Sequence, residues 1–460
     1  MVDSGDTGIS TQFKDSGTAA GMTKTRMKYY STNKQVPEVS FEEAIFKGLP
    51  DDNGLYMPKT IHRLPQEFFD TIQDKSLAEI GYEVASRFIE DEIPADDLKA
   101  LVADTMNFEI PVVEVEKGIY SLELYHGPTL AFKDVGARFL ARCMSYFSGK
   151  NEKKTTILVA TSGDTGAAVG AGFLGMANIN VVILYPGGGK ISKIQEKQLT
   201  TLGQNIIACE VDGTFDDCQK MVKESFLNQE MRAAYNLSSA NSINMARLVP
   251  QSFYYFWAYA QLKKKGIEDV AICVPSGNYG NLTAGLLAKE MGLPVKQYIA
   301  ASNANDIVPK YLHTGAFNPK PSVMTMSNAM DVGNPSNFFR MNDLYDASWD
   351  TFKENLVGYA YNDEQTAECI KEVKGRTEYL LDPHGAVGYL GLKAYLENNP
   401  AEAGVFLETA HPAKFGDVVE PIIKELVSMP DRLKAYAEGE KVAIEIGPNV
   451  DELKRVLEGI

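Results

Sequence analysis

The chain has 460 residues, 44% of them apolar, which is enough for about three domains of usual size with a sizeable core. Its 45 Lys and Arg residues are outnumbered by 61 Asp and Glu residues, and the formal charge of −16 disfavours binding to nucleic acid or to an anionic membrane. The five cysteines are scattered without a C-x-x-C spacing, which predicts a folded cytoplasmic protein without disulfides. The five histidines are scattered without zinc-ligand spacing, which predicts no metal site. No apolar run reaches the ~20 residues that a membrane span needs.

The first 110 residues separate into two parts. Residues 1–26 are rich in Gly, Ser, Thr and Asp and lack hydrophobic periodicity, which predicts a disordered leader. Helical patterns follow in "SFEEAIFKGL", where Ser40 is the expected N-cap and Gly48 the expected end, and in "SLAEIGYEVASRFI". We therefore expect a small, mainly helical N-terminal domain over residues 27–110, followed by one larger region over residues 111–460.

In the larger region, short apolar runs rich in Val and Ile alternate with amphipathic segments. The clearest runs are residues 155–160, 180–185, 205–211, 270–274 and 295–301. Buried strands separated by helices form parallel βαβ units, so the predicted fold class is α/β. Ligands of such sheets bind at the carboxyl ends of the strands, which makes the strand-to-helix loops the candidate sites.

Two of these loops are rich in Gly, Ser, Thr and Asn. The loop "ATSGDTGAA", residues 160–168, offers amides, hydroxyls and a helix start that suit a carboxylate or a phosphate, although an ordinary βα turn with a capping Thr or Asp explains it equally well. In "PSGNYGNLTAG", residues 275–285, Gly277 and Gly280 let the backbone approach an anion, but the spacing matches neither the dinucleotide fingerprint nor the P-loop. Two such loops in one sheet would strengthen the prediction of anion binding.

Two further segments carry candidate ligands for an anionic substrate. In "YPGGGKISKIQ", residues 185–195, Lys190 can neutralise an anion, although a solvated loop lysine is the more common explanation. In "NLSSANSINMARL", residues 236–248, the side chains of Asn241, Ser242 and Arg247 can converge on a phosphate. Helix capping by Ser or Asn is the competing explanation.

A single lysine, Lys133, ends the apolar stretch "TLAFK" at the expected start of a helix. A buried lysine must be neutral, paired or covalently modified, because desolvation disfavours its charged form. A neutral amine is a nucleophile and forms a Schiff base with an aldehyde cofactor. Pairing with Asp134 or Glu123, or extension of the amine to solvent, explains the same pattern without any function.

Taken together, these stretches resemble the threonine synthase family, which are pyridoxal-phosphate (PLP) enzymes of fold type II with the tryptophan-synthase-β-like fold. The resemblance spans roughly residues 27–430, and its motifs occur in collinear order: "LELYHGPTLAFKD", "TSGDTGAAV", "LYPGGGKIS", "DGTFDDCQ", "NSINMARL", "PSGNYGNLTAGLLAK", "SNAMDVGNPSN" and "FLETAHPAKF". It implies two parallel-sheet α/β lobes with the cofactor between them, the smaller near residues 135–245 and the larger formed by the remainder. It also implies a lyase that converts O-phospho-L-homoserine and water into L-threonine and phosphate.

The resemblance assigns roles to individual residues. Lys133 takes the Schiff-base position, and Thr409 the position whose hydroxyl faces the pyridine nitrogen. The cofactor-phosphate cup is formed by Gly277, Asn278, Tyr279, Gly280 and Asn281. The substrate α-carboxylate is assigned to the loop that contains Thr161, Ser162, Gly163, Asp164 and Thr165, and the substrate phosphate to Asn241, Ser242, Arg247 and Lys190.

One residue departs from the pattern of many fold-type-II enzymes, which have Asn at the place of Asp164. An ionised Asp would repel a carboxylate, so its backbone amide or a turn-capping role is the expected contribution. The alternative functions are another fold-type-II lyase, such as a threonine or serine dehydratase or an O-acetylserine sulfhydrylase, and a non-catalytic relative that senses PLP or a phosphorylated amino acid. The sequence leaves open whether the protein is a monomer or a homodimer.

Overall fold

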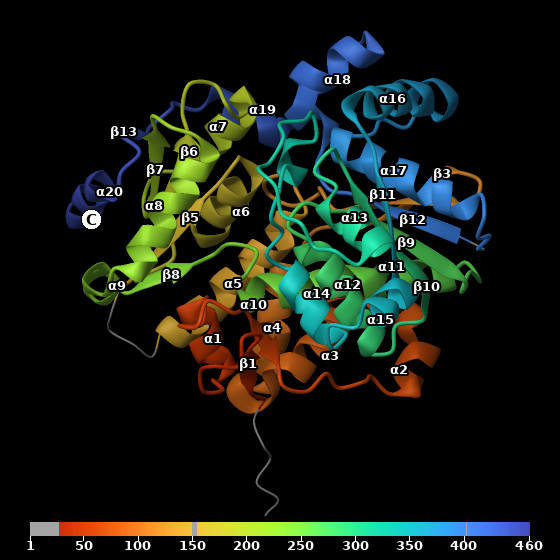
Figure 1. The fold of residues 1–460 in the computed structure, drawn as a ribbon, viewed down its shortest axis with the longest axis horizontal. Coiled ribbons are helices and arrows are strands. Elements are labelled where there is room, and N and C mark those ends of the chain that lie inside the picture. Colours follow the sequence, from red (N-terminus) through yellow and green to blue (C-terminus); the bar gives the residue numbers. More distant parts are fainter. Residues whose placement is uncertain (1–26, 150–153, 402) are drawn as a thin grey trace, which may run out of the picture.

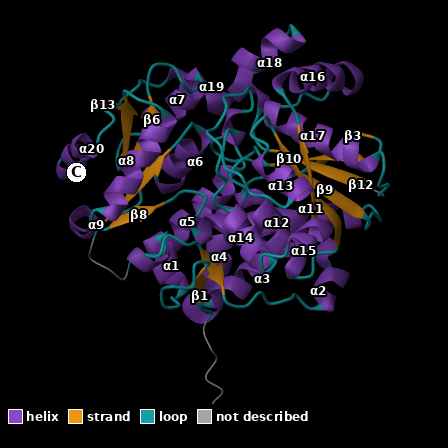
Figure 2. Ribbon diagram, in the orientation of Figure 1, coloured by secondary structure: helices purple, strands orange, loops and turns teal. Residues whose placement is uncertain are grey.

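Two separate β-sheets, each flanked by helices, form the body of the protein, with a mainly helical N-terminal region packed beneath them (Figure 1, Figure 2). The computed structural model describes residues 27–149, 154–401 and 403–460. The predicted leader, residues 1–26, lies outside the described residues. The arrangement confirms the predicted α/β class with two parallel-sheet lobes.

The smaller sheet has five strands in the order β13-β7-β6-β5-β8, and all of its neighbouring strands are parallel. The apolar runs predicted at residues 155–160, 180–185 and 205–211 form its three central strands. The strands are β5 (Thr155–Ala160), β6 (Ile179–Pro186), β7 (Ile206–Val211), β8 (Leu237–Ser239) and β13 (Ile444–Ile446), and the helices around them are α6 (Asp164–Phe173), α7 (Lys193–Thr200), α8 (Phe215–Leu227) and α9 (Gln229–Tyr235).

The larger sheet has six strands in the order β11-β10-β9-β12-β4-β3, and only the edge pair of β3 and β4 is antiparallel within it. Its strands are β3 (Val112–Glu116), β4 (Ile119–Glu123), β9 (Val270–Pro275), β10 (Val295–Ser302), β11 (Leu356–Ala360) and β12 (Ala403–Glu408). Its helices are α11 (Phe253–Lys263), α12 (Gly280–Glu290), α13 (Ile307–Thr314), α14 (Phe338–Leu344), α15 (Trp349–Asn355), α16 (Asp363–Thr377), α17 (Pro383–Leu396) and α18 (Gly416–Ile423).

The two lobes are joined by α5 (Lys133–Ser148) and α10 (Met245–Leu248), which pack on each other. Helix α5 follows β4 of the larger sheet along the chain and packs against α6 of the smaller lobe. It therefore places its first residue, Lys133, at the boundary between the lobes.

The N-terminal region forms helices where the sequence predicts them. It contains β1 (Tyr29–Ser31), α1 (Phe41–Lys47), β2 (Tyr56–Pro58), α2 (Gln66–Asp70), α3 (Leu77–Ile89) and α4 (Ala95–Thr105). Ser40 caps α1 in a capping box with Glu43, and Gly48 ends the helix at a φ of 68°. One hydrophobic core runs from this region into the rest of the molecule, because α3 packs on α11 and α4 packs on α5.

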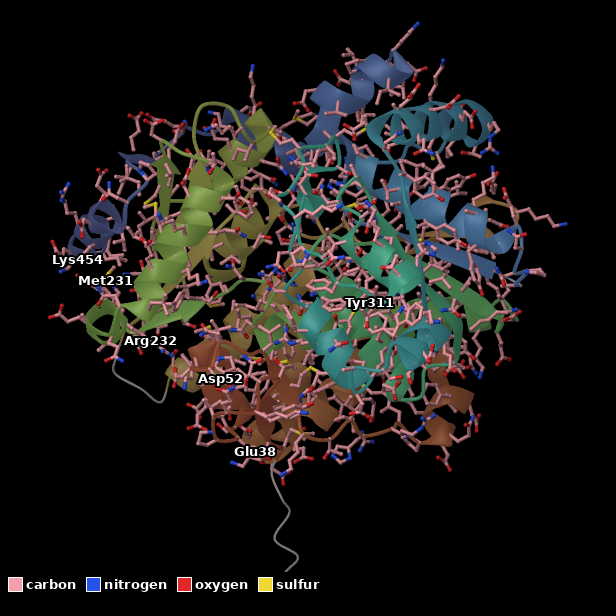
Figure 3. All side chains as sticks on the ribbon, in the orientation of Figure 1. Glu38, Asp52, Met231, Arg232, Tyr311 and Lys454 are labelled. Carbon is pink, nitrogen blue, oxygen red and sulfur yellow. The ribbon has the colours of Figure 1, made fainter. Side chains whose placement is uncertain are left out.

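The N-terminal region also reaches the far end of the smaller lobe. An Arg232 nitrogen on α9 lies 3.1 Å from a carboxylate oxygen of Asp51, and Figure 3 labels Arg232 and the neighbouring Asp52 where these two parts meet. The N-terminal region therefore contacts both lobes.

The C-terminal segment departs from the predicted division of lobes, which placed every residue after about 245 in the larger lobe. After β12 and α18, the chain returns through α19 (Asp431–Glu438) to the smaller lobe, where α19 packs on α7. Strand β13 then extends the smaller sheet beside β7, and α20 (Val450–Glu458) packs on α8 (Figure 1). No helix in the described part of the chain is long and apolar enough to cross a membrane.

Candidate active site

The loop before α5 is locked in place, and this fixes Lys133. The carboxylate of Asp134 accepts hydrogen bonds from the amide and hydroxyl of Thr129, at 2.8 and 2.7 Å. The amide of Phe132 donates to the carbonyl of Thr409 at 2.8 Å, which ties the start of α5 to the end of β12. The alternative explanation in which Lys133 pairs with Asp134 is not supported among the described residues, because Thr129 occupies that carboxylate.

Lys133 is half-buried at the start of α5, and three charged groups act on its amine. Burial lowers the pKa of the Lys133 amine to about 8; Asp164 opposes this shift, while Arg247 and Lys414 add to it. The structure thus gathers Lys133, the predicted carboxylate loop and the predicted phosphate ligand Arg247 in one electrostatic environment. About half of such amines are unprotonated at pH 8, compared with under ~1% at the ordinary pKa of 10.5.

The predicted carboxylate loop is a tight turn between β5 and α6. The hydroxyl of Thr161 accepts hydrogen bonds from the amides of Gly163, at 3.0 Å, and Gly166, at 2.9 Å, so this side chain shapes the loop. Gly163 has a φ of +133°, and a Cβ there would lie 2.5 Å from the side chain of Gln195. The amides of residues 162, 164 and 165 have no acceptor within the described ranges, which leaves them available to an anion.

The carboxylate of Asp164 is paired with a lysine that the sequence interpretation did not assign. Nζ of Lys414 lies 2.7 Å from Oδ1 of Asp164, and both side chains are buried. Nε2 of Gln195 donates to the same oxygen at 3.0 Å. Burial by itself raises the pKa of Asp164, but Lys414, Lys133 and these hydrogen bonds outweigh it, so the pKa falls below its ordinary value and Asp164 is ionised.

The predicted phosphate cup follows β9. Tyr279 has a positive φ of 60°. A Cβ at Gly277 would lie 2.6 Å from the Cα of Met330, so only glycine fits at that position. The amides of residues 277 to 281 donate to no acceptor among residues 27–149, 154–401 and 403–460. Five such donors at the start of α12 are suited to a phosphate dianion.

The side chains of the cup support the loop and connect it to the next segment. Asn281 donates to the carbonyl of Pro275 at 2.8 Å, and its own Oδ1 accepts from Leu282 N at 2.9 Å. The Nδ2 of Asn278 donates to the hydroxyl of Ser242 at 2.6 Å, which leaves the proton of that hydroxyl free for an anion. The cup and the segment around residues 241–247 therefore adjoin.

Arg247 is buried in that segment with an unused donor. Its Nη1 donates to the carbonyl of Ala240, and its Nε is buried without a hydrogen-bond partner in the described structure. Burial lowers the pKa of Arg247 to about 10, with Asp134 opposing the shift. A buried guanidinium with an unpaired nitrogen is suited to receive a phosphate.

The side chains of two predicted substrate residues make no hydrogen bond to another predicted site residue within the described ranges. Asn241 is half-buried, and its backbone carbonyl accepts from the amide of Asn244. Lys190 is exposed in the loop after β6, and its amine donates to the carbonyl of Gly213 at 2.7 Å rather than to any other predicted site residue. Lys133, Asp164 and Arg247 thus lie within electrostatic reach of one another, and the cup contacts Ser242, whereas Lys190 is exposed on the smaller lobe.

The two predicted anion loops belong to different sheets, which corrects the expectation of two loops in one sheet. Residues 160–164 end β5 of the smaller sheet, and residues 275–280 end β9 of the larger one. Thr409 directly follows β12, which pairs with β9; it is buried, and its hydroxyl makes no hydrogen bond within the described ranges. The arrangement offers cup amides, a hydroxyl and a lysine with a lowered pKa, which fits the phosphate, ring nitrogen and aldehyde of PLP.

Several supporting residues escaped the sequence interpretation. Asn337 donates to the carbonyl of Asn278 at 3.0 Å, and the amide of Ser336 donates to Oδ1 of Asn278 at 2.6 Å. Both lie in the quoted motif "SNAMDVGNPSN", and Lys414 lies in "FLETAHPAKF". The motifs indicated that these two segments belong to the site. Which of their side chains contact the predicted site residues is seen only from the tertiary structure.

Comparison with known proteins agrees with this geometry. Family models match residues 104–407 as a pyridoxal-phosphate dependent enzyme, residues 28–106 as the threonine synthase N terminus, and residues 385–457 as the threonine synthase C-terminal domain. The threonine synthase of Escherichia coli is 46% identical over 413 residues, covering 90% of this chain and 95% of that protein.

The chain belongs to the threonine synthase family.

Solved threonine synthases have the same fold. The crystal structure of the E. coli threonine synthase matches with a TM-score of 0.88 and 43% identity, covering 94% of this chain and 99% of that one. The PLP-bound threonine synthase of Brucella melitensis matches with a TM-score of 0.88 and 34% identity over the same shares. The protein is thus a PLP-dependent lyase of the threonine synthase family, and its cofactor is pyridoxal phosphate.

Proposed function

We propose that this protein makes L-threonine and phosphate from O-phospho-L-homoserine and water, with Lys133 as the residue that holds the cofactor and moves protons. The observation that carries the proposal is the position of Lys133. Its amine has a lowered pKa and lies under the influence of both Asp164, in the predicted carboxylate loop, and Arg247, in the predicted phosphate site. A substrate with an anion at each end would place its Cα between them.

The cofactor would be held at three places. The amides of residues 277–281 would bind its phosphate, the hydroxyl of Thr409 would face its ring nitrogen, and the amine of Lys133 would bond to its aldehyde carbon. When bound, PLP supplies a conjugated ring that delocalises the electron pair left at Cα after proton loss. A neutral hydroxyl at Thr409 does not hold a proton on that ring, so the delocalisation is milder than beside an Asp.

The substrate would be gripped at its two anionic ends. The amides of residues 162, 164 and 165, with the side chains of Ser162 and Thr165, would bind the α-carboxylate. Arg247, Ser242 and Asn241 would bind the phosphate, and Lys190 on the rim would add a cation near the entrance. Within the carboxylate loop, Thr161 would shape the turn, whereas Ser162 and Thr165 would donate to the substrate.

Lys133 would act as base and acid whenever its amine is free. A free amine with a pKa of about 8 can accept the Cα proton near neutral pH. Loss of a second proton from Cβ then expels phosphate from Cγ, and Arg247 stabilises the charge of the leaving group. One proton would return to Cγ and one, from Lys133, to Cα, while water would add its hydroxyl at Cβ and leave its proton on the released phosphate.

The experiment compares two substrates with the purified full-length protein. Phosphate release and threonine formation from O-phospho-L-homoserine are measured alongside ketoacid release from L-threonine. We expect equal amounts of phosphate and threonine in the first assay and little ketoacid in the second. Ketoacid from threonine without turnover of the phosphorylated substrate would identify a dehydratase instead.

We place the protein in the cytoplasm, and its cysteines support this location. All five are buried free thiols. This pattern supports a reducing cytoplasm as the location, since disulfides are typical of oxidising compartments.

A further inference from the structure

The ion pair between Lys414 and Asp164 is fixed at both ends. Lys414 is fully buried, and its amine donates to the carbonyl of Thr129 at 2.9 Å as well as contacting Asp164 at 2.7 Å. Asp164 in turn accepts from Gln195, and the Thr129 carbonyl accepts a second hydrogen bond from Gln198 at 3.0 Å. A buried pair with such supporting hydrogen bonds keeps one geometry.

The pair connects the three segments that carry the proposed chemistry. Asp164 is the first residue of α6, inside the loop proposed to receive the substrate α-carboxylate. Thr129 lies four residues before Lys133, and Lys414 lies five residues after Thr409. Lys414 therefore joins the carboxylate loop of the smaller lobe to both the Lys133 segment and the β12 segment of the larger sheet.

An unpaired carboxylate at Asp164 would conflict with the function of its own loop. The free amides of residues 162, 164 and 165 favour an anion, whereas the Asp164 carboxylate repels one. The charged groups that act on Lys133 are Asp164, Arg247 and Lys414, and those that act on Asp164 are Lys414 and Lys133. Lys414 is the cation in hydrogen-bond contact with Asp164 in this set, so it supplies the local neutralisation.

We infer that Lys414 is a positioning residue that neutralises Asp164 and thereby allows the 161–165 loop to bind the substrate carboxylate. The inference rests on the proposed function, in which this loop holds the α-carboxylate. The two groups also act in opposite directions on the pKa of the Lys133 amine, which Asp164 raises and Lys414 lowers. Lys414 itself exchanges no atoms with the substrate and acts through Asp164.

The test uses a double-mutant cycle of Lys414→Met, Asp164→Asn and the combined variant. Binding of L-threonine, which carries an α-carboxylate, and of inorganic phosphate is measured on each holoenzyme by equilibrium titration. We expect Lys414→Met to weaken threonine binding at least tenfold and to leave phosphate binding within about twofold. The combined variant should recover threonine binding, because it removes the unpaired negative charge.

A second readout does not depend on the cofactor. The reactivity of Lys133 toward acetic anhydride is followed by mass spectrometry against pH, on the full-length chain after removal of PLP. Lys414→Met should raise the midpoint by about one pH unit, since Asp164 then acts on Lys133 alone, and Asp164→Asn should lower it. The control is Lys441→Met, at a lysine paired with Glu196 and Glu210 on the smaller lobe, which should leave the midpoint unchanged.

The outcomes separate the two proposals. Equal weakening of threonine and phosphate binding by Lys414→Met, or a combined variant no better than the single one, would overturn the role of Lys414. If Lys414→Met does not fold, the fall of the Lys133 midpoint in Asp164→Asn still decides whether Asp164 acts on the amine; an unchanged midpoint overturns the inference. Failure of the unmodified enzyme to form threonine would refute the proposed function instead.

Discussion

At the scale of single residues, the site depends on how the protein treats buried charge. Lys133 has a lowered pKa because it is desolvated and close to Arg247 and Lys414, whereas Asp164 stays ionised because Lys414 contacts it. Arg247 keeps an unpaired buried nitrogen. A buried donor without a partner costs stability, and an anionic ligand at Arg247 would offset that cost.

Replacing Lys133 with Ala should remove both activity and colour. Threonine formation should fall by about 10³-fold or more, because a positioned acid–base group contributes about 10²–10⁴ and the covalent hold on the cofactor is lost as well. The visible absorption band of the bound cofactor should shift or vanish in the same sample. Lys310→Ala, which removes an exposed lysine paired with Asp306, should change neither. A coloured, active Lys133→Ala enzyme would refute the assignment of Lys133.

Arg247→Lys should weaken binding of the phosphorylated substrate. Lysine keeps the charge but loses the planar fork, so the KM for O-phospho-L-homoserine should rise about tenfold to a hundredfold. The affinity for PLP should stay within about twofold, since the cup amides are unchanged. Steady-state kinetics and a cofactor titration separate these effects, and an unaltered KM would argue against Arg247 as a phosphate ligand.

The sequence was informative about these residues to different degrees. Lys133, Arg247 and the cup at residues 277–281 stand in motifs whose residue types are chemically suggestive, and the structure places them together. Asp164 looked like an obstacle, because its partner Lys414 is 250 residues away in the chain. Lys190 looked like a ligand from its glycine-rich loop, yet its amine is held by the carbonyl of Gly213. Side-chain partners at long sequence separation cannot be inferred from local pattern.

At the scale of elements, loops at strand ends provide the donors. The free amides, those of residues 162, 164, 165 and 277–281, lie at the carboxyl ends of the buried parallel strands β5 and β9. Apolar runs and caps predicted most of these strands and helices, because burial and capping are local properties. Strand β13 could not be predicted as a member of the smaller sheet, since Ile444–Ile446 is short and its pairing with β7 is decided by tertiary contact.

Gly277→Ala should reduce the affinity for PLP at least tenfold. The new methyl group would lie 2.6 Å from the Cα of Met330, which is backbone, so the cup must shift. Fluorescence or absorbance titration of the cofactor measures the effect. Gly375→Ala provides the matched control, because a Cβ there meets no atom within 4 Å on α16. Equal affinities for the two variants would show that the loop is not a phosphate cup.

At the scale of the whole molecule, buried contacts tie the N-terminal region and both lobes into one unit. Arg340 of α14 is fully buried and donates to the carbonyls of Tyr56, at 3.1 Å, and Ile243, at 2.6 Å, and to Oδ1 of Asn337 at 2.8 Å. These acceptors belong to the N-terminal region, the phosphate-site segment and the loop that supports the cup. The N-terminal region therefore contributes directly to the shape of the site.

The C-terminal segment makes a second connection. Leu433 of α19 is fully buried in a small cluster with Leu130, from the loop before Lys133, and Ala413, against which Ile194 of α7 packs. Leu433→Ala should lower the free energy of unfolding by ~2–4 kcal/mol and increase hydrogen exchange in the Lys133 loop. The same substitution at Leu426, whose side chain is 89% exposed, should change stability by less than ~0.5 kcal/mol. Similar unfolding curves for the two variants would show that this cluster does not contribute to the free energy of unfolding.

The path of this segment has a mechanical consequence. It leaves the larger sheet at the end of β12, passes over the Lys133 loop at Leu433 and re-enters the smaller sheet as β13. A separation of the lobes must stretch or peel this span, so it acts as a tether that limits how far they swing apart. If threonine leaves by separation of the lobes, the length and anchorage of this span would limit how far they open.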